Sequence, residues 1–562
     1  MLLADSAYGA PRRFRRAWTG FILVLTVLPY LANFWLTPKG ETYTWILPPY
    51  PADAYAYRAW AKQAYDGHWL FSLKFTALPH RPFLFLPFFL AAGRLARLSG
   101  ADIGLVHLFL KSVGVVFFFW AFFGFLRHLK LTPRQSIAAA VFAGISSGFG
   151  GLAPLVFKEG LSPTWTPVDV WLVDSNTFWS LLWNPLFPFS LALMILSVHC
   201  ADASLEENDL GRAWTAGLCL AALAFLHPYP LAVLYPLLTA LCVLKRPRDW
   251  LPFWLRIVGA SLPAALSIAA LSFLHPLVRT HNDLGTIGSL APFSYLAGFG
   301  LPLALAAAGP FVERGFAKKY WPLFSWLGLS LVLSYCPVWF RIKYIFGAHM
   351  PICILAGAAS EPLLESLPVA PARKTALAAL IVALMSCTQF TNLRAGLAEV
   401  EENRDGMFRI PDGMMAGLKY LETRSDHSQL VFAAPPTSAK IAAFSGNTVL
   451  WGHWAQAVDS RERHARIRSI FSADSDLSLK ERRREFWGPG VEYLFLDGNW
   501  RGGFRTGVAP SLLADADEVF VNADVSIYRR AGRAGRAFSP FSNSASHEFK
   551  TAVSLGSPIS RP

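Results

Sequence analysis

A single carboxylate, Asp53, stands among aromatic residues in the stretch YPADAYAYRAW (residues 50–60), directly after the first long apolar segment of the chain. Pro51 precedes it and Gly67 closes a helical pattern, so the spacing predicts a helix with Asp53 at its N-cap. A carboxylate that is held rigidly at a helix N-terminus stays ionised and can act as a general base. Asp53 is therefore the candidate catalytic residue, and the alternative is that it only caps the helix.

Three side chains of the same predicted helix are candidates for binding a substrate. Tyr57 and Trp60 share a helix face with Asp53, and Arg58 lies on a neighbouring face. Aromatic side chains just outside an apolar segment also dock helices at the membrane interface, which is the simpler explanation of this pattern. Core packing explains Trp60 equally well.

Polar residues from two later stretches can converge on the same face of the membrane. Asp174 lies in VDSNTFW, and Arg341 and Lys343 lie two apart in FRIKYIF. Two cations beside a tyrosine can hold an anionic headgroup at the bilayer surface. For either cation alone, the alternative is a snorkelling side chain that positions a span. The motif WGHW at 451–454 is explained sufficiently by the end of a strand.

The composition indicates a membrane protein. Of 562 residues, 54% are hydrophobic and only 16% are charged, whereas a soluble domain carries about 25% charged residues. The net charge of +14 arises from short basic clusters between apolar segments, where membrane proteins keep their cytoplasmic charges, so we exclude nucleic acid as a partner. The six cysteines form no CxxC motif, so neither a zinc site nor a disulfide framework is indicated.

Apolar segments of about 20 residues predict a polytopic α-helical membrane protein with about 11 transmembrane helices. These segments lie at about 17–36, 103–126, 136–157, 178–199, 213–228, 229–244, 251–273, 291–312, 320–338, 342–360 and 375–392. Lys and Arg cluster at the N-terminus and in alternate connections, which predicts a cytoplasmic N-terminus and an outer C-terminus. The short segment 81–100 has arginines near its end, and we interpret it as an interfacial or re-entrant helix.

These assignments divide the chain into three parts. Residues 1–393 form a transmembrane core whose first outer loop, 37–102, is unusually long. Residues 394–534 alternate apolar strands with charged helical stretches, which predicts a soluble α/β domain on the outer side. Residues 535–562 are rich in Ser, Gly and Pro, which predicts a disordered tail.

This arrangement resembles the GT-C class of integral-membrane glycosyltransferases, such as protein O-mannosyltransferases, lipid A aminoarabinose transferases and oligosaccharyltransferase catalytic subunits. The resemblance covers roughly residues 15–392 and lies in the architecture, above all in the long first outer loop with its early acidic residue. His80-Arg81-Pro82 stands where members of the class have KPPL or HPPL. Many members carry a paired acidic motif, whereas Asp53 is flanked by alanines.

The resemblance implies an inverting transfer of a sugar from a polyprenyl-phosphate donor to a glycan, lipid or protein acceptor on the outer face. Asp53 would accept the proton of the acceptor, aromatic rings would stack on the sugar, and the cations would hold the phosphate. No cofactor is certain, and a divalent metal at the acidic residue is left open. The Ala/Arg-rich composition predicts a bacterial inner (plasma) membrane and therefore a periplasmic outer side. Substrate contacts are predicted for Tyr57, Arg58, Trp60, His80, Arg81, Asp174, Arg341 and Lys343.

Other functions remain open at this point. The unpaired Asp53 favours a non-catalytic GT-C-like component of a polysaccharide or lipid export or assembly system. A transporter would place ionisable residues in mid-span, where this chain has few. A polymerase or ligase of another membrane fold would place its decisive loop late in the chain. The predicted α/β domain could bind the acceptor, dock a partner or cover the cavity.

Overall fold

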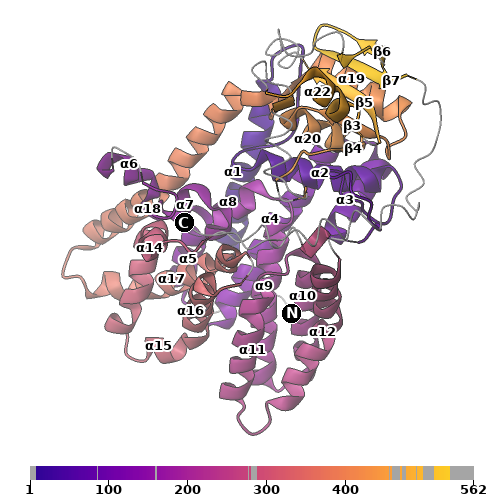
Figure 1. Ribbon diagram of the computed structural model, residues 1–562. Coiled ribbons are helices and arrows are strands. Elements are labelled where there is room, and N and C mark those ends of the chain that lie inside the picture. The colour runs from indigo at the N-terminus through magenta and orange to yellow at the C-terminus, as the bar shows by residue number, and fades with distance from the viewer. Residues whose placement is uncertain are drawn as a thin grey trace.

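The computed structural model of the protein describes residues 8–531, except for residues 85, 158–160, 276, 280–287, 339, 455, 458–468, 471–475, 489, 498–511 and 515. The predicted tail at 535–562 therefore lies outside the described residues. Long helices form most of the molecule, and a small sheet with its own helices lies at one end of them (Figure 1).

Seven helices among the described residues are long and apolar enough to cross a membrane. They are α1 (Arg12–Trp35), α4 (Ile103–His128), α9 (Phe187–Glu207), α12 (Leu251–Leu274), α14 (Pro292–Val312), α17 (His349–Ser366, together with the short helix η3, Arg341–Ile345) and α18 (Pro371–Glu402). An eighth candidate is a pair bent by 51°, in which α5 (Pro133–Ile145) is followed by the segment Gly150–Val156. The protein is thus an integral membrane protein that crosses the bilayer several times.

Three shorter apolar helices coincide with the remaining predicted spans. They are α10 (Leu210–Leu226), α11 (Leu231–Lys245) and α16 (Trp321–Tyr335), and each has at most 17 residues. About 20 apolar residues are needed to cross the hydrocarbon core at right angles. The total of eleven spans and the orientation of the chain therefore stay predictions.

The predicted span at 178–199 is wrong in its bounds. The structure has two helices there, α8 (Thr177–Trp183) and α9. Asn184 lies between them in an extended conformation and is followed by Pro185. A proline cannot donate a backbone hydrogen bond and disfavours helical geometry in the residue before it, so the helix ends at this point.

The first outer loop contains two packed helices. Helix α2 (Pro51–Tyr65) lies against α3 (Pro87–Ser99), and a Cβ atom on Gly93 would lie 2.0 Å from the carbonyl oxygen of Ala61. Only glycine permits this close approach of the two backbones. The predicted interfacial segment 81–100 is thus the 13-residue helix α3, which is too short to cross a bilayer.

The C-terminal region contains a five-stranded sheet of the order β4-β3-β5-β7-β6. Strands β4 (Thr448–Val449), β3 (Leu430–Ala433) and β5 (Val491–Asp497) are parallel, and β7 (Val525–Arg530) is antiparallel to β5 and to β6 (Ala516–Val521). The helices of this domain are α19 (Asp412–Arg424), α20 (Pro435–Phe444) and α22 (Leu479–Phe486). All five strands coincide with the alternating apolar stretches of the sequence, so the prediction of a sheet is confirmed.

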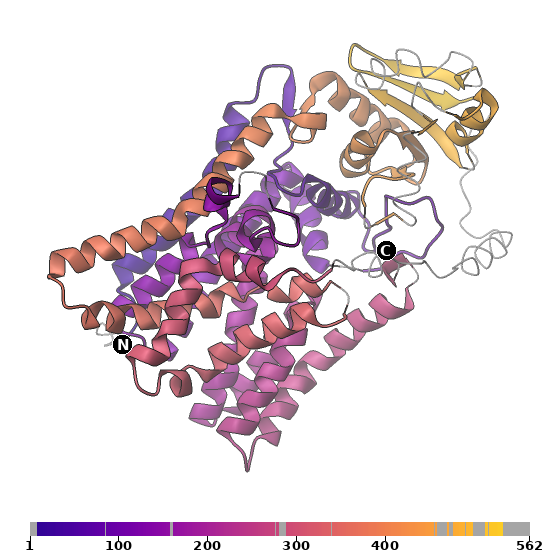
Figure 2. The same ribbon diagram turned by 60° about the vertical axis from the view of Figure 1, so that its left-hand side comes forward.

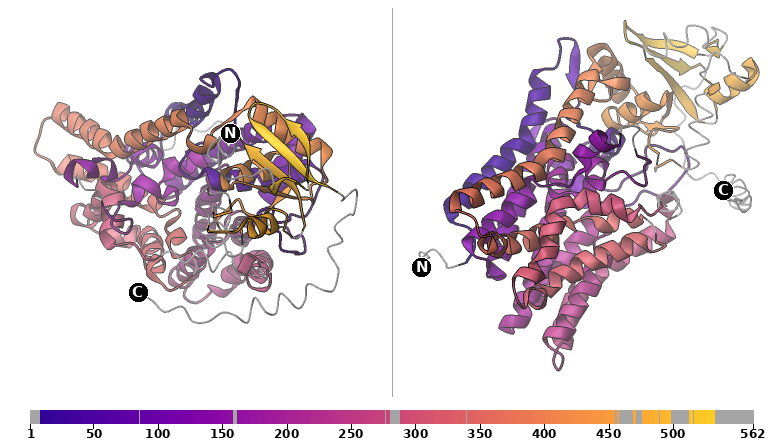
Figure 3. Two further views of the ribbon diagram at one scale, coloured as in Figure 1. Left: turned by 45° about the horizontal axis from the view of Figure 1, so that its top comes forward. Right: turned by 90° about the vertical axis from the view of Figure 1, so that its left-hand side faces the viewer.

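The long helix α18 joins the membrane core to this domain and runs along one side of the molecule (Figure 2). It continues past residue 393, where the sequence analysis ends the core, to Glu402. Strand β2 (Arg409–Pro411) follows and pairs antiparallel with β1 (Glu41–Tyr43) of the first outer loop. This pairing joins the C-terminal domain to the first outer loop, and α20 of that domain packs on α2. Figure 3 shows the yellow sheet of the domain at one end of the helical bundle.

A shared apolar core fixes this contact. Tyr55, Ala56 and Ala59 of α2 are buried against Ile441 and Ala442 of α20. The hydroxyl group of Tyr55 also donates a hydrogen bond of 2.9 Å to the carbonyl oxygen of Met407. Because each of these apolar side chains is almost fully buried, the domain and the first outer loop form one packed unit.

Candidate active site

Asp53 lies in the first turn of α2, but it is not the N-cap residue. Tyr50 occupies the N-cap, without a side-chain capping bond, and Pro51 is the first helical residue. Proline favours this position because its missing N–H would have no partner there and its φ angle suits a helix. The prediction of an Asp53 N-cap is therefore wrong by three residues. The carboxylate still lies near the positive end of the helix dipole, which favours its ionised form.

The carboxylate of Asp53 accepts a hydrogen bond from a histidine that the sequence analysis did not select. Nε2 of His453 lies 2.9 Å from Oδ1 of Asp53. His453 belongs to the WGHW motif of the C-terminal domain, 400 residues away along the chain. Dismissing this motif as a strand end was wrong, because the strand delivers the histidine to the first outer loop.

A second carboxylate acts on the same lysine as Asp53. Asp174, in the short helix η2 (Val173–Ser175), is 1% exposed, and its Oδ2 lies 2.8 Å from Nζ of Lys343 in η3. Lys343 lies within electrostatic range of Asp53 as well as Asp174. Asn176 anchors the Asp174 loop, since its side chain donates to the carbonyl oxygen of Ser146 at 2.9 Å and caps α8.

Two tyrosines lie beside both carboxylates. Burial, and then the charges of Asp174 and Asp53, raise the pKa of Tyr50. Burial raises the pKa of Tyr57 well above its usual value, and the charges of Asp53 and Asp174 contribute. Both rings pack edge-on against Trp183, which fixes their orientation. The structure thus brings together four predicted site residues, which are Asp53, Tyr57, Asp174 and Lys343.

The structure places Arg58 elsewhere. Its guanidinium group makes a two-pronged contact with Asp102, at 3.0 Å from Nη1 to Oδ1 and 2.5 Å from Nη2 to Oδ2, and lies 4.0 Å from the ring centre of Phe444. Asp102 in turn caps α4. Arg58 therefore links the first outer loop to a membrane helix and to α20, which is a structural role.

Replacing Arg58 should destabilise the fold. We expect Arg58→Ala to lower the free energy of unfolding by about 2–3 kcal/mol, because it removes a buried, paired charge and its contact with an aromatic ring. Arg81→Ala is the matched control: Arg81 is exposed, and its loss should change stability by less than about 0.5 kcal/mol. Thermal unfolding of both variants in one detergent tests this expectation, and equal unfolding temperatures would contradict it.

The other predicted residues also make local contacts. His80 binds its own loop, since its Nε2 accepts from the amide of Leu73 at 2.8 Å and its Nδ1 lies 2.8 Å from the carbonyl oxygen of Leu78. Arg341 donates to the hydroxyl group of Ser289 at 3.1 Å. Trp60 is buried in the core of the membrane domain, 5% exposed, and touches Tyr57 and Phe89. Their substrate contacts stay predictions.

The residues around Asp53 fit a divalent metal poorly. Lys343 already supplies a positive charge to Asp174, which would repel a cation placed between the two carboxylates. Among the described residues, one group of three potential metal ligands was found, which consists of His128, Asp202 and Glu206. It lies at the C-terminal end of α4, whereas Asp102 of the first outer loop caps the N-terminal end. Lys245 already contacts both carboxylates of this group, at 2.6 and 2.9 Å. We therefore derive no step through a metal.

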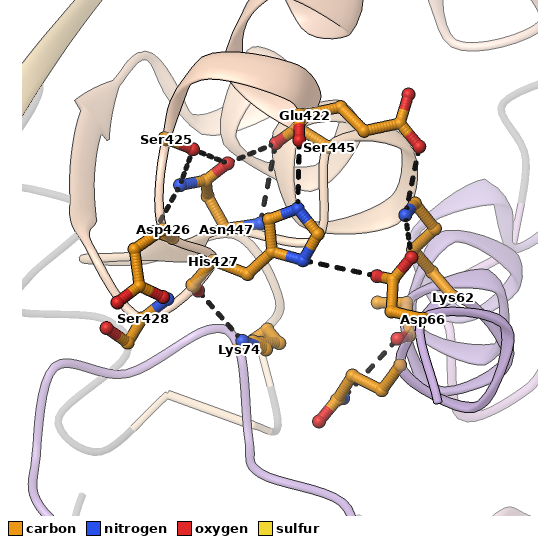
Figure 4. A network of polar contacts seen from close by, with 12 residues as sticks. Lys62, Asp66, Lys74, Glu422, Ser425, Asp426, His427, Ser428, Ser445 and Asn447 are labelled. Atoms are coloured by element: carbon orange, nitrogen blue, oxygen red, sulfur yellow. Dashed lines mark hydrogen bonds and ion pairs between the residues drawn. The ribbon is translucent and has the colours of Figure 1, made fainter. Parts of the chain in front are cut away.

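A second histidine–aspartate pair lies at the other end of α2 (Figure 4). Nδ1 of His427 lies 3.3 Å from Oδ2 of Asp66, and Lys62 contacts both Asp66 and Glu422 of α19. The hydrogen bond to Asp66 raises the pKa of His427, against the effect of burial. Burial disfavours ionised Asp66, but His427 and Lys62 outweigh this and lower its pKa. The C-terminal domain therefore contacts both ends of α2 through a histidine.

This second pair should make stability depend on pH. The raised pKa of His427 means that its contribution is complete below its usual value of 6.5 and is lost as the pH rises through the raised pKa. The lowered pKa of Asp66 gives a contribution that is present above its usual value of 3.8. We expect the unfolding temperature of the wild type to fall by about 2–4 °C more than that of His427→Gln between pH 6 and 9. Identical pH profiles of the two proteins would contradict this expectation.

Comparison with known proteins supports the fold. The chain matches no protein-family model and no curated protein sequence. Among solved structures, the arabinofuranosyltransferase AftD from mycobacteria aligns with 92% of this chain and 40% of its own, at 16% identity and a TM-score of 0.50. This is the GT-C fold. The resemblance of the sequence to the GT-C class is thus confirmed at the level of architecture.

Two further GT-C structures align at slightly lower scores. ArnT from Cupriavidus metallidurans, solved with undecaprenyl phosphate, aligns over 93% of this chain and 99% of its own, at 11% identity and a TM-score of 0.49. The oligosaccharyltransferase AglB from Archaeoglobus fulgidus, solved with an inhibitory peptide and a dolichol-phosphate, aligns over 87% and 70%, at 14% identity and a TM-score of 0.47.

Proposed function

We propose that the protein is a glycosyltransferase that moves a sugar from a polyprenyl-phosphate donor to an acceptor, with inversion at the anomeric carbon. The observation that carries this proposal is that Lys343 pairs with Asp174 and also feels the charge of Asp53, although the three residues belong to short helices far apart in a chain with the GT-C fold. A donor of this kind keeps its prenyl tail in lipid and its phosphate at the interface. The site offers a carboxylate for the acceptor and a cation for the phosphate.

Asp53 is the general base of the proposed reaction. Its carboxylate takes the proton from the acceptor hydroxyl group while the acceptor oxygen forms a bond to the anomeric carbon. The bond between that carbon and the phosphate oxygen breaks, and the phosphate leaves with the electron pair. Attack on the face opposite the leaving group inverts the anomeric configuration. Asp53 is 28% exposed, which leaves the carboxylate accessible to an acceptor.

Lys343 and the tyrosines have separate roles in this proposal. The ammonium group of Lys343 is 30% exposed and stabilises the negative charge that develops on the departing phosphate. Asp174 is buried beside it and holds the ammonium group in place. Tyr57 stacks on Phe89, with ring centres 4.8 Å apart, so it forms part of the aromatic wall beside Asp53.

The proposed reaction takes place on the outer face of a bacterial inner membrane. The basic N-terminus and the basic connections support eleven spans with a cytoplasmic N-terminus, which leaves the first outer loop and the C-terminal domain in the periplasm. The shorter apolar helices α10, α11 and α16 would then cross a locally thinned bilayer or span it with flanking residues.

Native mass spectrometry of the purified protein tests the donor class. We expect a bound polyprenyl phosphate, or its sugar adduct, in the wild-type protein as isolated. Purified protein should also transfer sugar from a synthetic polyprenyl-phosphate sugar to water or to an added acceptor. Neither a bound lipid nor any turnover with such donors would overturn the proposal and favour a non-catalytic component of an export or assembly system.

A further inference from the structure

The turn that follows β4 reaches from the C-terminal domain into the site around Asp53. It carries His453, whose side chain is 5% exposed, whereas that of Asp53 is 28% exposed. An imidazole that is buried to this extent cannot meet an acceptor, but it can hold the carboxylate that does. The 2.9 Å contact between His453 Nε2 and Asp53 Oδ1 has the length of a charge-assisted or strong neutral hydrogen bond.

Three contacts fix this turn against the first outer loop. The amide of Val449 in β4 donates to the carbonyl oxygen of Lys74 at 2.8 Å. A Cβ atom on Gly452 would lie 2.7 Å from the ring of the fully buried Phe75, so the turn passes the loop at a distance that only glycine allows. The imidazole of His453 then packs on Phe75, with ring centres 5.8 Å apart. The histidine is therefore held from both sides before any substrate arrives.

We infer that His453 is a positioning residue for Asp53, and that the C-terminal domain thereby forms part of the catalytic unit. This inference rests on the function proposed above. By donating to Oδ1, His453 restrains the rotation of the carboxylate about its χ angles and so fixes the position of the proposed base. Rates of transfer depend steeply on such placement, and a shift of about 1 Å can cost about 100-fold.

The two histidines that contact α2 therefore have different roles. His453 acts on the catalytic carboxylate, whereas His427 pairs with Asp66 at the far end of the helix and serves only to hold the domain in place. Both histidines belong to the same domain, both bond an aspartate of the same helix, and both are partly or fully buried. His427 is thus a matched control for His453.

Steady-state kinetics of four proteins test the inference: wild type, His453→Ala, His453→Gln and His427→Gln. We expect His453→Ala to lower kcat by about 10–100-fold with little change in the KM for the donor, because the carboxylate loses its restraint but the phosphate site is intact. His453→Gln should recover most of this loss, since a glutamine amide can donate the same hydrogen bond. His427→Gln should lower thermal stability and leave kcat unchanged.

Two outcomes would overturn the inference. One is wild-type kcat for His453→Ala; the other is an equal loss of kcat for His453→Ala and His427→Gln, which would reflect general loosening of the domain. If His453→Ala does not fold, His453→Met takes its place, because methionine fills a similar volume without a strong hydrogen-bond donor, and the same two outcomes overturn the inference. Failure of the proposed function gives a different result, because the wild-type protein itself would then transfer no sugar.

Discussion

Asp53→Asn should reduce sugar transfer by at least about 10³-fold while the protein still folds and inserts into membranes. Asparagine has the size of aspartate but cannot accept a proton from the acceptor, and general base catalysis contributes about 10²–10⁴-fold to a rate. Its side-chain oxygen can still accept the hydrogen bond of His453. The measurement is the initial rate of transfer from a synthetic polyprenyl-phosphate sugar, with purified protein in detergent or nanodiscs.

Asp66→Asn is the matched control for this variant. Asp66 follows the same helix at its other end and also pairs with a histidine of the C-terminal domain. Its replacement should lower the unfolding temperature without a large change in the rate of transfer. A wild-type rate for Asp53→Asn would show that Asp53 is not the base, and a loss of similar size in both variants would indicate a structural effect.

Lys343→Met should impair both folding and transfer. Removing the ammonium group leaves Asp174, which is 1% exposed, as a buried charge without its ion-pair partner. Such a change costs about 3 kcal/mol or more. It should also remove the positive charge that stabilises the leaving phosphate, with a loss of about 10²–10³-fold in kcat. Thermal unfolding and transfer kinetics measure the two effects separately.

The double variant Lys343→Met with Asp174→Asn separates stability from catalysis. Neutralising both partners removes the buried charge, so most of the lost stability should return. Transfer should stay low, because the cation is still absent. Recovery of transfer together with stability would mean that Lys343 only supports the fold and that the proposed role at the phosphate is wrong.

The membrane core could be predicted from the sequence because a long apolar run suits few structures other than a transmembrane helix. The sheet could be predicted for a related reason: stretches such as VEYLFLD at 491–497 are short, mostly apolar runs between charged helical stretches, which suits a buried strand between helices. The break between α8 and α9 was missed because the mean hydropathy of the segment 178–199 stays high in spite of Asn184 and Pro185. This dipeptide nevertheless favours a helix end. The position of the proline therefore predicts the end of the helix better than the mean hydropathy of the segment does.

Site residues could be proposed from the sequence only where their residue type differed from that of the neighbouring residues. Asp53, Asp174 and Lys343 stood out because charged residues are rare beside apolar segments. His453 could not be predicted, because its partner lies 400 residues away and nothing local marks the contact. The pairing of Arg58 with Asp102 could not be predicted either, because the two residues belong to different elements 44 positions apart; its substrate contact stays a prediction.

The pairing of β1 with β2 has a consequence for the order in which the protein is made. Thr42 in the middle of β1 and Asp412 directly after β2 are hydrogen-bonded across 370 residues of chain. At a synthesis rate of about 5–20 residues per second, the first loop waits roughly 20–70 s for its partner strand. By the time β2 is made, the membrane helices from α4 to α18 have been synthesised, but the loop that carries Asp53 has still to pair with the C-terminal domain. We therefore expect a chain truncated before β2 to hold the proposed base without His453, and to transfer no sugar.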